Sequence, residues 1–553
     1  MLFRKRKLRN VDTLDPDEVF LDSGNLPDFD TGQFEGVIER PITDKVILLL
    51  GGVFFLIIAI FLVRIFILQV IAVDRYEALA SNNRLEHSTI FTERGVIYDR
   101  NGIELAWNNP ERTYSDIRGL GHVLGYVSYP TADELEVGDV HPKEFVGRDG
   151  VESYFNGTLQ GATGIKILEV DVLGEVQSES VLRQPEDGRS VNLSIDSEVQ
   201  EKLYTSIKDL SIDRGFVGGS GLIMDIETGE LLAATNYPEY SPNVLARGND
   251  PDTLVSYQSD ERKPFLNRAF QGLYTPGSIF KPFVALAALN EGLVNPEKVF
   301  HTTGQLEIVN PYDETKSTIF RDWKNHGAVN MEDAIAVSSN VYFFSIGGGF
   351  GDQEGVGISR IEKYSRLFGL SERSGSGVGG EGEGVIPNPE WKQETFGEPW
   401  RLGDTYNTSI GQYSLQVTPI QMVRAISAIA NNGKLLKPSF IKGGDKRTTK
   451  NIEINQSAFE VVQDGMRAAV SRGTASGLDI YGLEVSAKTG TAEIDFGKKK
   501  VNSWVVGYFP AEEPRYAFTV VMESGPRDNF IGGVFVMRQL LDWMVQNTPE
   551  YIK

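Results

Sequence analysis

The segment from Val46 to Val63 is an unbroken run of eighteen apolar residues, VILLLGGVFFLIIAIFLV. Arg64 interrupts it, and the apolar character then continues to Val73. A helix rises about 1.5 Å per residue, so this run crosses a hydrocarbon core of about 30 Å. It is too long, and begins too far into the chain, for a cleaved signal peptide. A buried core helix is the alternative, but we expect residues 46–73 to form one transmembrane helix.

Basic residues near the N-terminus indicate which way this helix crosses the membrane. Five of them lie at positions 4–7 and 9, a cluster of the kind that stays on the cytoplasmic side. The rest of residues 1–45 is acidic and lacks apolar periodicity, which predicts a largely disordered cytoplasmic tail. We therefore expect a single-pass protein of the cell membrane, with its large C-terminal part outside the cytoplasm.

Composition excludes several classes of function. The 553 residues include no cysteine and only five histidines, and the formal net charge is −22. Without cysteine the chain can form no disulfide, zinc finger, iron–sulfur cluster or thiol nucleophile. No two histidines have the spacing of a metal-binding motif, so we expect neither a metal nor a cofactor. The acidic balance argues against nucleic acid, whose binding requires a basic surface.

The residues after the apolar run fall into two parts. Residues 74–190 are short polar segments separated by Gly and Pro, with a turn at 99–102 between two expected strands and another strand at IKILEVDV. We predict a mostly β structural module here, the pedestal. From residue 191 to 553, strands at both ends (GLIMDIETGELLAATNYP and VNSWVVGYFP) enclose helical segments. This order predicts an α+β domain whose sheet uses both ends.

The segment TPGSIFKPF carries a candidate nucleophile and a candidate base. Ser278 and Lys281 are three residues apart, so a helix beginning near Pro276 places both side chains on one face. A serine needs a neighbouring base to attack at neutral pH, and with no suitable histidine we expect that base to be a lysine. Ser278 would also lie among the N–H groups of a helix start, which can hold an oxyanion. A lone Ser278 would more often be a helix cap.

Two further segments strengthen this interpretation. Ser338 and Asn340, in SSN at the end of a helical segment, offer a hydroxyl and an amide for proton relay and substrate contact. A probable strand carries Lys488, Thr489, Gly490 and Thr491. The cation and hydroxyls of this strand can hold a carboxylate, and its glycine lets a substrate backbone approach. The order S-x-x-K, S-x-N, K-T-G is the signature set of penicillin-binding proteins and serine β-lactamases.

On these motifs the chain resembles a class B penicillin-binding protein of the elongation type. Further segments that look like landmarks of that family include RGVIYDRNG, GRDGVESYFNGTLQGATG and LGDTYNTSIGQYSLQVTPIQM. The resemblance implies one N-terminal transmembrane helix, a pedestal (74–190) and a penicillin-binding transpeptidase domain (191–553) with an antiparallel sheet and helices. It also implies a D,D-transpeptidase that cross-links peptidoglycan stem peptides, is acylated by β-lactams and works beside a glycosyltransferase of the SEDS family.

The resemblance implies a role for each candidate residue. Ser278 would be the nucleophile and Lys281 its base, while Ser338 and Asn340 would assist proton transfer and hold the donor peptide. The N–H groups of Ser278 and Thr491 would form the oxyanion hole. The residues that would bind the terminal carboxylate and polarise the hydroxyl network are Lys488, Thr489 and Thr491.

Three features depart from the family's pattern. Tyr413 stands in SIGQY where the family usually has Gly, which indicates an altered groove nearby. The Gly-rich loop at 375–384 lacks an apolar-Pro step that is often found there. The segment WNNPERTYSDIRGLGHVLGYV joins directly two parts that relatives usually separate by a long insertion. We therefore expect a pedestal with a reduced head.

Two other functions are compatible with the motifs. A D,D-carboxypeptidase or a β-lactamase-type hydrolase would use water as acceptor, and nothing in the sequence excludes water. A non-enzymatic β-lactam sensor or wall-assembly scaffold fits less well with an intact Ser278 and Lys281. A sensor would also be expected to have a larger cytoplasmic part than residues 1–45.

Overall fold

A computed structural model of the protein describes residues 44–76, 85–137, 141–170, 175–310, 313–444, 448–494, 497 and 499–552. Nearly all of the predicted cytoplasmic tail lies outside these residues. By its internal contacts the chain forms two compact units. The first comprises 1–86 and 168–179, and the second comprises 87–167 and 180–553.

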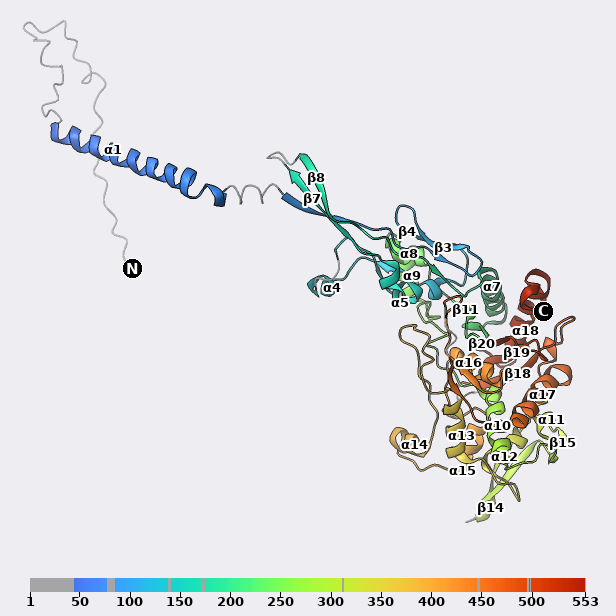
Figure 1. The fold of residues 1–553 in the computed structure, drawn as a ribbon. Helices are drawn as coiled ribbons and strands as arrows, with labels where there is room; N and C mark the ends of the chain where they lie inside the picture. Colours follow the sequence, from blue (N-terminus) through green and yellow to red (C-terminus); the bar gives the residue numbers. More distant parts are fainter. Residues whose placement is uncertain are drawn as a thin grey trace, which may run out of the picture. The chain divides into compact units, whose positions relative to one another are not determined.

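The first unit contains the apolar helix that the sequence predicts. Helix α1 (Asp44–Phe66; Figure 1) continues as a π-helical turn, η3 (Ile67–Ile71). Neither element has a buried residue. It is long enough and apolar enough to span a membrane. The strand predicted at IKILEVDV is also present: β7 (Gly164–Val170) pairs between β1 (Leu85–Ile90) and β8 (Val176–Arg183), and the boundary between the units passes through these strands.

The second unit includes a small four-stranded sheet, three strands of which lie in the predicted pedestal and the fourth just after it. Its order is β4 (Arg112–Tyr114), β3 (Glu104–Asn108), β2 (Ile97–Tyr98), β9 (Val191–Asn192). The predicted turn at 99–102 joins β2 and β3, with Asp99 Oδ1 accepting from the backbone N–H groups of Asn101 and Ile103. Short elements complete the region: α3 (Gly121–Leu124), β5 (Val127–Ser128), α4 (Ala132–Val137), β6 (Val146–Gly147), α5 (Gly150–Tyr154) and α6 (Asn156–Leu159).

Residues 87–167 pack directly against the later part of the chain. Glu239 accepts hydrogen bonds from the N–H groups of Gly119 (2.6 Å) and Gly121 (2.8 Å). Tyr114 and Asn243 exchange two more, at 3.0 and 2.8 Å. Because these contacts join the two parts into one compact unit, the domain boundary at residue 190 stays a prediction from sequence.

A five-stranded antiparallel sheet organises the rest of the second unit. Its order is β11 (Leu231–Tyr237), β10 (Gly218–Asp225), β20 (Tyr516–Pro526), β19 (Lys500–Phe509), β18 (Ser486–Glu493). Strands from both ends of residues 191–553 therefore meet in one sheet, as predicted. The inner strands are buried on both faces, which explains their nearly continuous apolar sequences. β18 is an edge strand.

Helices cover both faces of this sheet (Figure 1). One core lies between the sheet and the helices α7 (Ser197–Arg214) and α18 (Gly533–Asn547). A larger core on the other face gathers the helices α10 (Lys281–Asn290), α11 (Met331–Ala336), α12 (Asn340–Gly348), α13 (Gly357–Leu367), α15 (Leu402–Ser409), α16 (Pro419–Ala430) and α17 (Gln456–Arg472). The site described below lies on this side, beside β18.

The remaining elements are short or peripheral. They are α8 (Pro242–Arg247), α9 (Pro251–Ser259), α14 (Pro389–Phe396), β12 (Phe300–Thr302), β13 (Gln305–Asn310), β14 (Asp313–Arg321), β15 (Gly327–Val329), β16 (Lys434–Leu436), β17 (Thr448–Asn451), η4 (Gly277–Phe280), η5 (Ser476–Leu478) and η6 (Pro549–Tyr551). Of these, η4 and the hairpin of β13 and β14 border the site.

Candidate active site

Ser278 and Lys281 lie on the short helical turn that the sequence predicts. Residues Gly277–Phe280 form the 3-10 helix η4, and α10 continues from Lys281 with Pro282 in its first turn. A 3-10 helix has three residues per turn, so positions i and i+3 lie one above the other. Ser278 is half-buried and Lys281 is fully buried. The turn thus presents the hydroxyl to the surface and holds the amine beneath it.

Ser338 and Asn340 lie in a sharp turn between two helices. The sequence suggests one helical segment ending at SSN, but the chain forms α11, breaks, and starts again as α12 at Asn340. Ser338 has a φ of +59°, which a continuous helix cannot accommodate. Ser339 then caps α12, since its Oγ accepts from the Tyr342 N–H at 3.3 Å. The break turns the Ser338 and Asn340 side chains toward Lys281.

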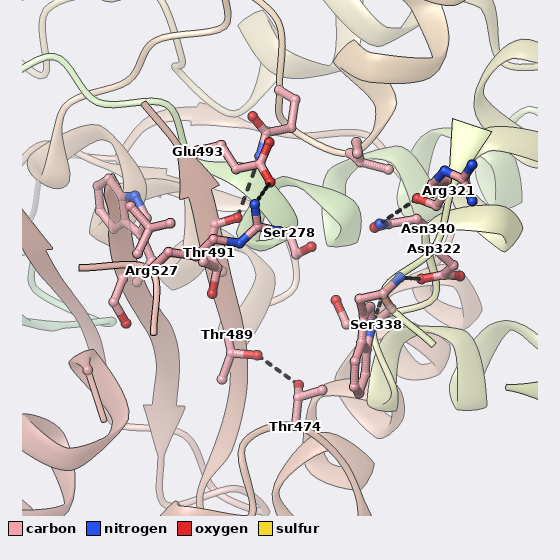
Figure 2. Close-up of a pocket in the computed structure, with 18 of the residues that line it drawn as sticks. Ser278, Arg321, Asp322, Ser338, Asn340, Thr474, Thr489, Thr491, Glu493 and Arg527 are labelled. Atoms are coloured by element: carbon pink, nitrogen blue, oxygen red, sulfur yellow. Dashed lines mark hydrogen bonds and ion pairs between the residues drawn. The ribbon is translucent and has the colours of Figure 1, made fainter. Parts of the chain in front are cut away.

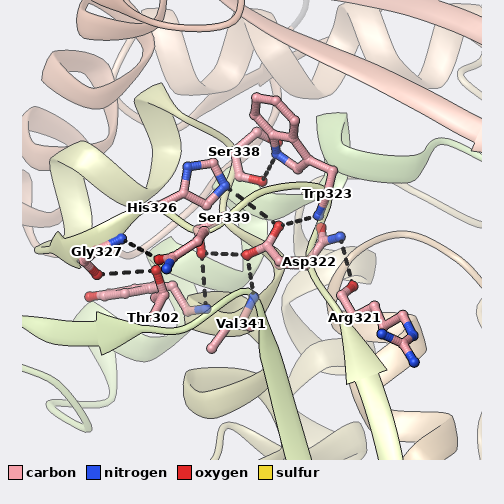
Figure 3. Close-up of polar contacts among 12 residues, drawn as sticks. Thr302, Arg321, Asp322, Trp323, His326, Gly327, Ser338, Ser339 and Val341 are labelled. Atoms are coloured by element: carbon pink, nitrogen blue, oxygen red, sulfur yellow. Dashed lines mark hydrogen bonds and ion pairs between the residues drawn. The ribbon is translucent and has the colours of Figure 1, made fainter.

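A buried carboxylate holds this turn in place (Figure 3). Asp322 Oδ2 accepts from Ser339 Oγ at 2.8 Å and from the Val341 N–H at 3.0 Å. His326 Nε2 lies 3.6 Å from Asp322 Oδ1. The Trp323 indole N–H donates to the Ser338 carbonyl at 3.3 Å. The left-handed conformation of Ser338 is therefore supported from several sides.

The edge strand β18 carries the third motif. Thr489 and Thr491 alternate with the buried Lys488 and Gly490, following the two-residue period of a strand. A Cβ at position 490 would lie 2.8 Å from the carbonyl oxygen of Pro276 and 3.0 Å from the side chain of Ile279, so only glycine allows β18 to pack this close to η4. This reason differs from the sequence expectation, which is close approach of a substrate backbone.

The hydroxyl of Ser338 joins the two lysines. Ser338 Oγ accepts from Lys488 Nζ at 2.8 Å and from Lys281 Nζ at 3.2 Å. Lys281 also donates to the Ser338 carbonyl and to Asn340 Oδ1, both at 2.8 Å. All three donors of a Lys281 ammonium thus have acceptors in the Ser338–Asn340 turn. Because both lone pairs of the Ser338 oxygen are occupied, its own proton is left for donation to a third group.

Burial changes the acidity of both amines. Burial lowers the pKa of Lys281 to about 7, and the negative charge of Asp322 opposes this effect. Burial, and then the charge of Lys281, lower the pKa of Lys488. Near neutral pH Lys281 therefore exists partly as the free amine, which can accept a proton from a hydroxyl.

These segments surround one cavity of about 1270 Å³ (Figure 2). Six of the eight predicted site residues line it: Ser278, Ser338, Asn340, Thr489, Gly490 and Thr491. Lys281 and Lys488 are fully buried beneath its surface. The sequence suggests that the Lys488 cation touches a substrate carboxylate. In the structure Lys488 is buried, so it can act on the cavity through its hydrogen bond to Ser338 and through its electric field.

Several lining residues have no motif that the sequence analysis recognised. Thr474 accepts from Thr489 Oγ1 at 2.8 Å and so orients that hydroxyl. Asp322 and Trp323 follow β14 and reach the site only because the hairpin folds back on α12. Arg527 and Glu493, which also line the cavity, form an ion pair at 3.2 Å. Among the described residues, no group of three or more His, Asp or Glu is placed to hold a metal ion.

The geometry suits acyl transfer. A hydroxyl at a helix start faces the cavity, an amine of lowered pKa lies one turn below it, and a second hydroxyl is shared by two amines. The backbone of the edge strand beside them can pair with an extended peptide.

The chain is similar to known proteins in sequence and in fold. The family model described as the penicillin binding protein transpeptidase domain matches residues 219–534. The chain belongs to this family. A second model, the penicillin-binding protein dimerisation domain, matches residues 108–193, most of which belong to the predicted pedestal. The resemblance drawn from the sequence is thereby confirmed, as is the α+β fold with one N-terminal apolar helix.

Individual relatives agree with the family. Peptidoglycan D,D-transpeptidase MrdA of Acinetobacter baumannii is 29% identical over 434 residues, which is 73% of this chain and 62% of that protein. The complex of PBP2 and MreC from Helicobacter pylori contains a chain with a TM-score of 0.72 and 25% identity, covering 84% of this chain and 99% of that one. A peptidoglycan synthase complex that coordinates polymerization and crosslinking gives a TM-score of 0.71 and 26% identity, with 90% and 96% covered.

Proposed function

We propose that this chain is a peptidoglycan D,D-transpeptidase of cell-wall elongation, which cross-links stem peptides through an acyl-enzyme on Ser278. One observation carries the assignment of the site: three motifs far apart in sequence meet where Ser338 Oγ accepts from both Lys281 and Lys488. The activity named for the MrdA relative supports the reaction class.

Acylation begins with the free amine of Lys281. The amine takes the proton of Ser278 Oγ, which attacks the carbonyl carbon between the two terminal D-alanines. The N–H groups of Ser278 and Thr491 hold the oxygen of the tetrahedral intermediate. The proton passes through the Ser338 hydroxyl to the leaving amine, the C–N bond breaks, and free D-alanine departs.

Binding of the donor uses the edge strand. Thr489 and Thr491 present hydroxyls to the cavity, and the Thr489 hydroxyl is oriented by Thr474. The buried Lys488 adds positive potential where the terminal carboxylate lies, within a chain of net charge −22. Asn340, fixed by Lys281, contacts the donor amide.

The acyl-enzyme is resolved by the amine of a neighbouring stem peptide, which attacks the ester carbonyl and releases Ser278. Water at the same position would give a carboxypeptidase, which remains the second candidate. β-Lactams open on the same Ser278 and leave a stable ester. Slow loss of a bound penicillin favours the transpeptidase, whereas rapid turnover favours a hydrolase.

The test of the site uses fluorescent penicillin with the full-length protein in detergent. The wild type should form a covalent adduct that Ser278→Ala loses, while equal melting temperatures of the two proteins show that the variant folds. Release of D-alanine from a pentapeptide, with and without an amine acceptor, separates the two candidate reactions. Equal labelling of both proteins, or of neither, would contradict the proposal.

We also propose that α1 crosses the cell membrane with the N-terminus in the cytoplasm, and that the catalytic part lies outside. The chain has no cysteine, so single cysteines report topology without background. A membrane-impermeant maleimide added to spheroplasts should label Glu513→Cys but label Ser23→Cys only after lysis. The reverse pattern would invert the topology.

The partner proposed for α1 is a SEDS-family glycosyltransferase. Similarity to a chain of the peptidoglycan synthase complex that coordinates polymerization and crosslinking supports this proposal. The match to that chain covers 90% of the present protein. Arg64 lies in the last turn of α1, where its charge can pair with a polar group on the partner's helices. Arg64→Leu should weaken co-purification with that partner more than Arg64→Lys, while penicillin labelling stays unchanged.

A further inference from the structure

Tyr413 has a backbone conformation that residues with side chains rarely adopt. Its φ is +69°, in the left-handed region that glycine enters without steric cost. A bulky residue there is strained, and such strain persists only where surrounding contacts hold it. Strained residues of this kind gather at binding and catalytic sites, so Tyr413 is a candidate for a role in binding.

The turn that carries Tyr413 is fixed to the nucleophile's segment. The Gly411 carbonyl accepts from the Gly277 N–H at 2.8 Å, and a Cβ on Gly411 would overlap the Gly277 carbonyl. Gln412 Nε2 lies 3.5 Å from the Thr491 carbonyl on β18. Tyr413 is therefore held at a set position relative to Ser278 and to the edge strand.

Aromatic residues support the ring of Tyr413 from behind. Trp400 packs edge-on at 5.8 Å between ring centroids, and Trp391 packs edge-on at 6.3 Å. Lys392 Nζ lies 5.9 Å from the ring centroid and is itself paired with Asp404 at 2.6 Å. These contacts fix the orientation of the ring.

Tyr413 itself lines the cavity that Ser278 lines, whereas Trp391, Lys392 and Trp400 are not among the lining residues. The side chain is only partly buried, so packing in the core does not account for the strained backbone. Ile410 and Gln412 line the cavity beside it, next to Thr491. A peptide paired with β18 would therefore run close to this ring, because Gln412 lies beside Thr491 on that strand.

We propose that Tyr413 is a specificity-determining residue whose ring forms an apolar wall for the acyl side of the donor, so that donors with an apolar or aromatic group there are acylated faster. The proposal rests on the proposed function and names the feature of the substrate that this site selects. Without the ring, that group would lose its contact while the chemistry at Ser278 continued.

The experiment compares two penicillins with the same nucleus: one with a phenylacetyl side chain, and 6-aminopenicillanic acid, which has none. Second-order acylation rates are measured for the full-length wild type, Tyr413→Phe, Tyr413→Gly and Tyr413→Asn. Glycine and asparagine both tolerate a positive φ, so two independent variants remove the ring without adding strain. Tyr413→Phe keeps the ring and loses only the hydroxyl.

The ratio of the two rates should fall about 10-fold in Tyr413→Gly and in Tyr413→Asn, and change less than about 2-fold in Tyr413→Phe. A ratio that stays at the wild-type value in both ring-deletion variants would overturn the proposal. Failure of the proposed function looks different, since Ser278→Ala would then label as well as the wild type.

Discussion

Asp322 Oδ2 accepts a hydrogen bond of 2.8 Å from Ser339 Oγ, 17 residues further along the chain. The same oxygen accepts from the Val341 N–H, so the carboxylate holds the residues on both sides of Asn340. Its side chain is fully buried, and the groups that face it include His326 and, through space, the buried Lys281. Asp322 thus both shapes the turn and sets the charge beneath it.

Replacing this carboxylate should change the pH dependence as well as the rate. Asp322→Asn keeps the shape but removes a charged hydrogen-bond acceptor, so we expect penicillin acylation to slow about 10- to 100-fold. The charge of Asp322 raises the pKa of Lys281, so its loss should move the rise of the rate–pH curve to lower pH. Glu307→Gln, an exposed carboxylate on the adjacent hairpin, is the control. A slower rate with an unmoved curve would leave Asp322 only a structural role.

The wild type should itself show a titration near neutrality. Burial lowers the pKa of Lys281 to about 7, and only the neutral amine accepts the proton of Ser278. The second-order acylation rate should therefore be low below this pKa, rise through it and level off above it. Lys281→Arg, which stays protonated, should be slow throughout. A flat profile for the wild type would show that Lys281 is not the base.

Gly490 should not tolerate even one added carbon. In Gly490→Ala the methyl group would lie 2.8 Å from the Pro276 carbonyl oxygen, so β18 and η4 must separate. We expect a loss of stability of about 1–3 kcal/mol and a marked loss of penicillin acylation. Gly379→Ala, which meets nothing within 4 Å, should behave as the wild type in thermal unfolding and labelling.

A buried ion cluster should stabilise the pedestal. Glu152 is fully buried and accepts from the Nε of both Arg94 and Arg112 at 2.6 Å. Glu152→Gln leaves two buried cations without their partner, so the free energy of unfolding should fall by about 3–5 kcal/mol. Glu136→Gln, at an exposed position, should change it by less than about 0.5 kcal/mol. An unchanged unfolding midpoint for Glu152→Gln would contradict this interpretation of the cluster.

Sequence reasoning locates the elements whose signals are local. The apolar run predicts α1, the strand-like segment GLIMDIETGELLAATNYP predicts the hairpin of β10 and β11, and the spacing of Ser278 and Lys281 predicts a shared helical turn. Each of these depends on residues within a few positions of one another, where periodicity and capping act directly.

Features that depend on distant segments could not be predicted in this way. The break at Ser338 follows from Asp322 and Trp323, which a folded-back hairpin brings to the turn. The burial of Lys488 follows from the packing of η4 against an edge strand, and a charged strand residue is ordinarily solvent-exposed. Tyr413 departs from the family's pattern in the sequence itself, but its strained φ depends on the fold.

The contact between Gly490 and Pro276 has a consequence for how resistance to β-lactams could arise. At the centre of the site, backbone atoms set the spacing between the segment of the nucleophile and the edge strand. Few substitutions there can therefore exclude a drug without also disturbing this spacing. Substitutions that discriminate between antibiotic and peptide have more freedom at the rim, where Tyr413 and Trp323 meet solvent. We therefore expect resistance to select changes at the rim before changes in the motifs.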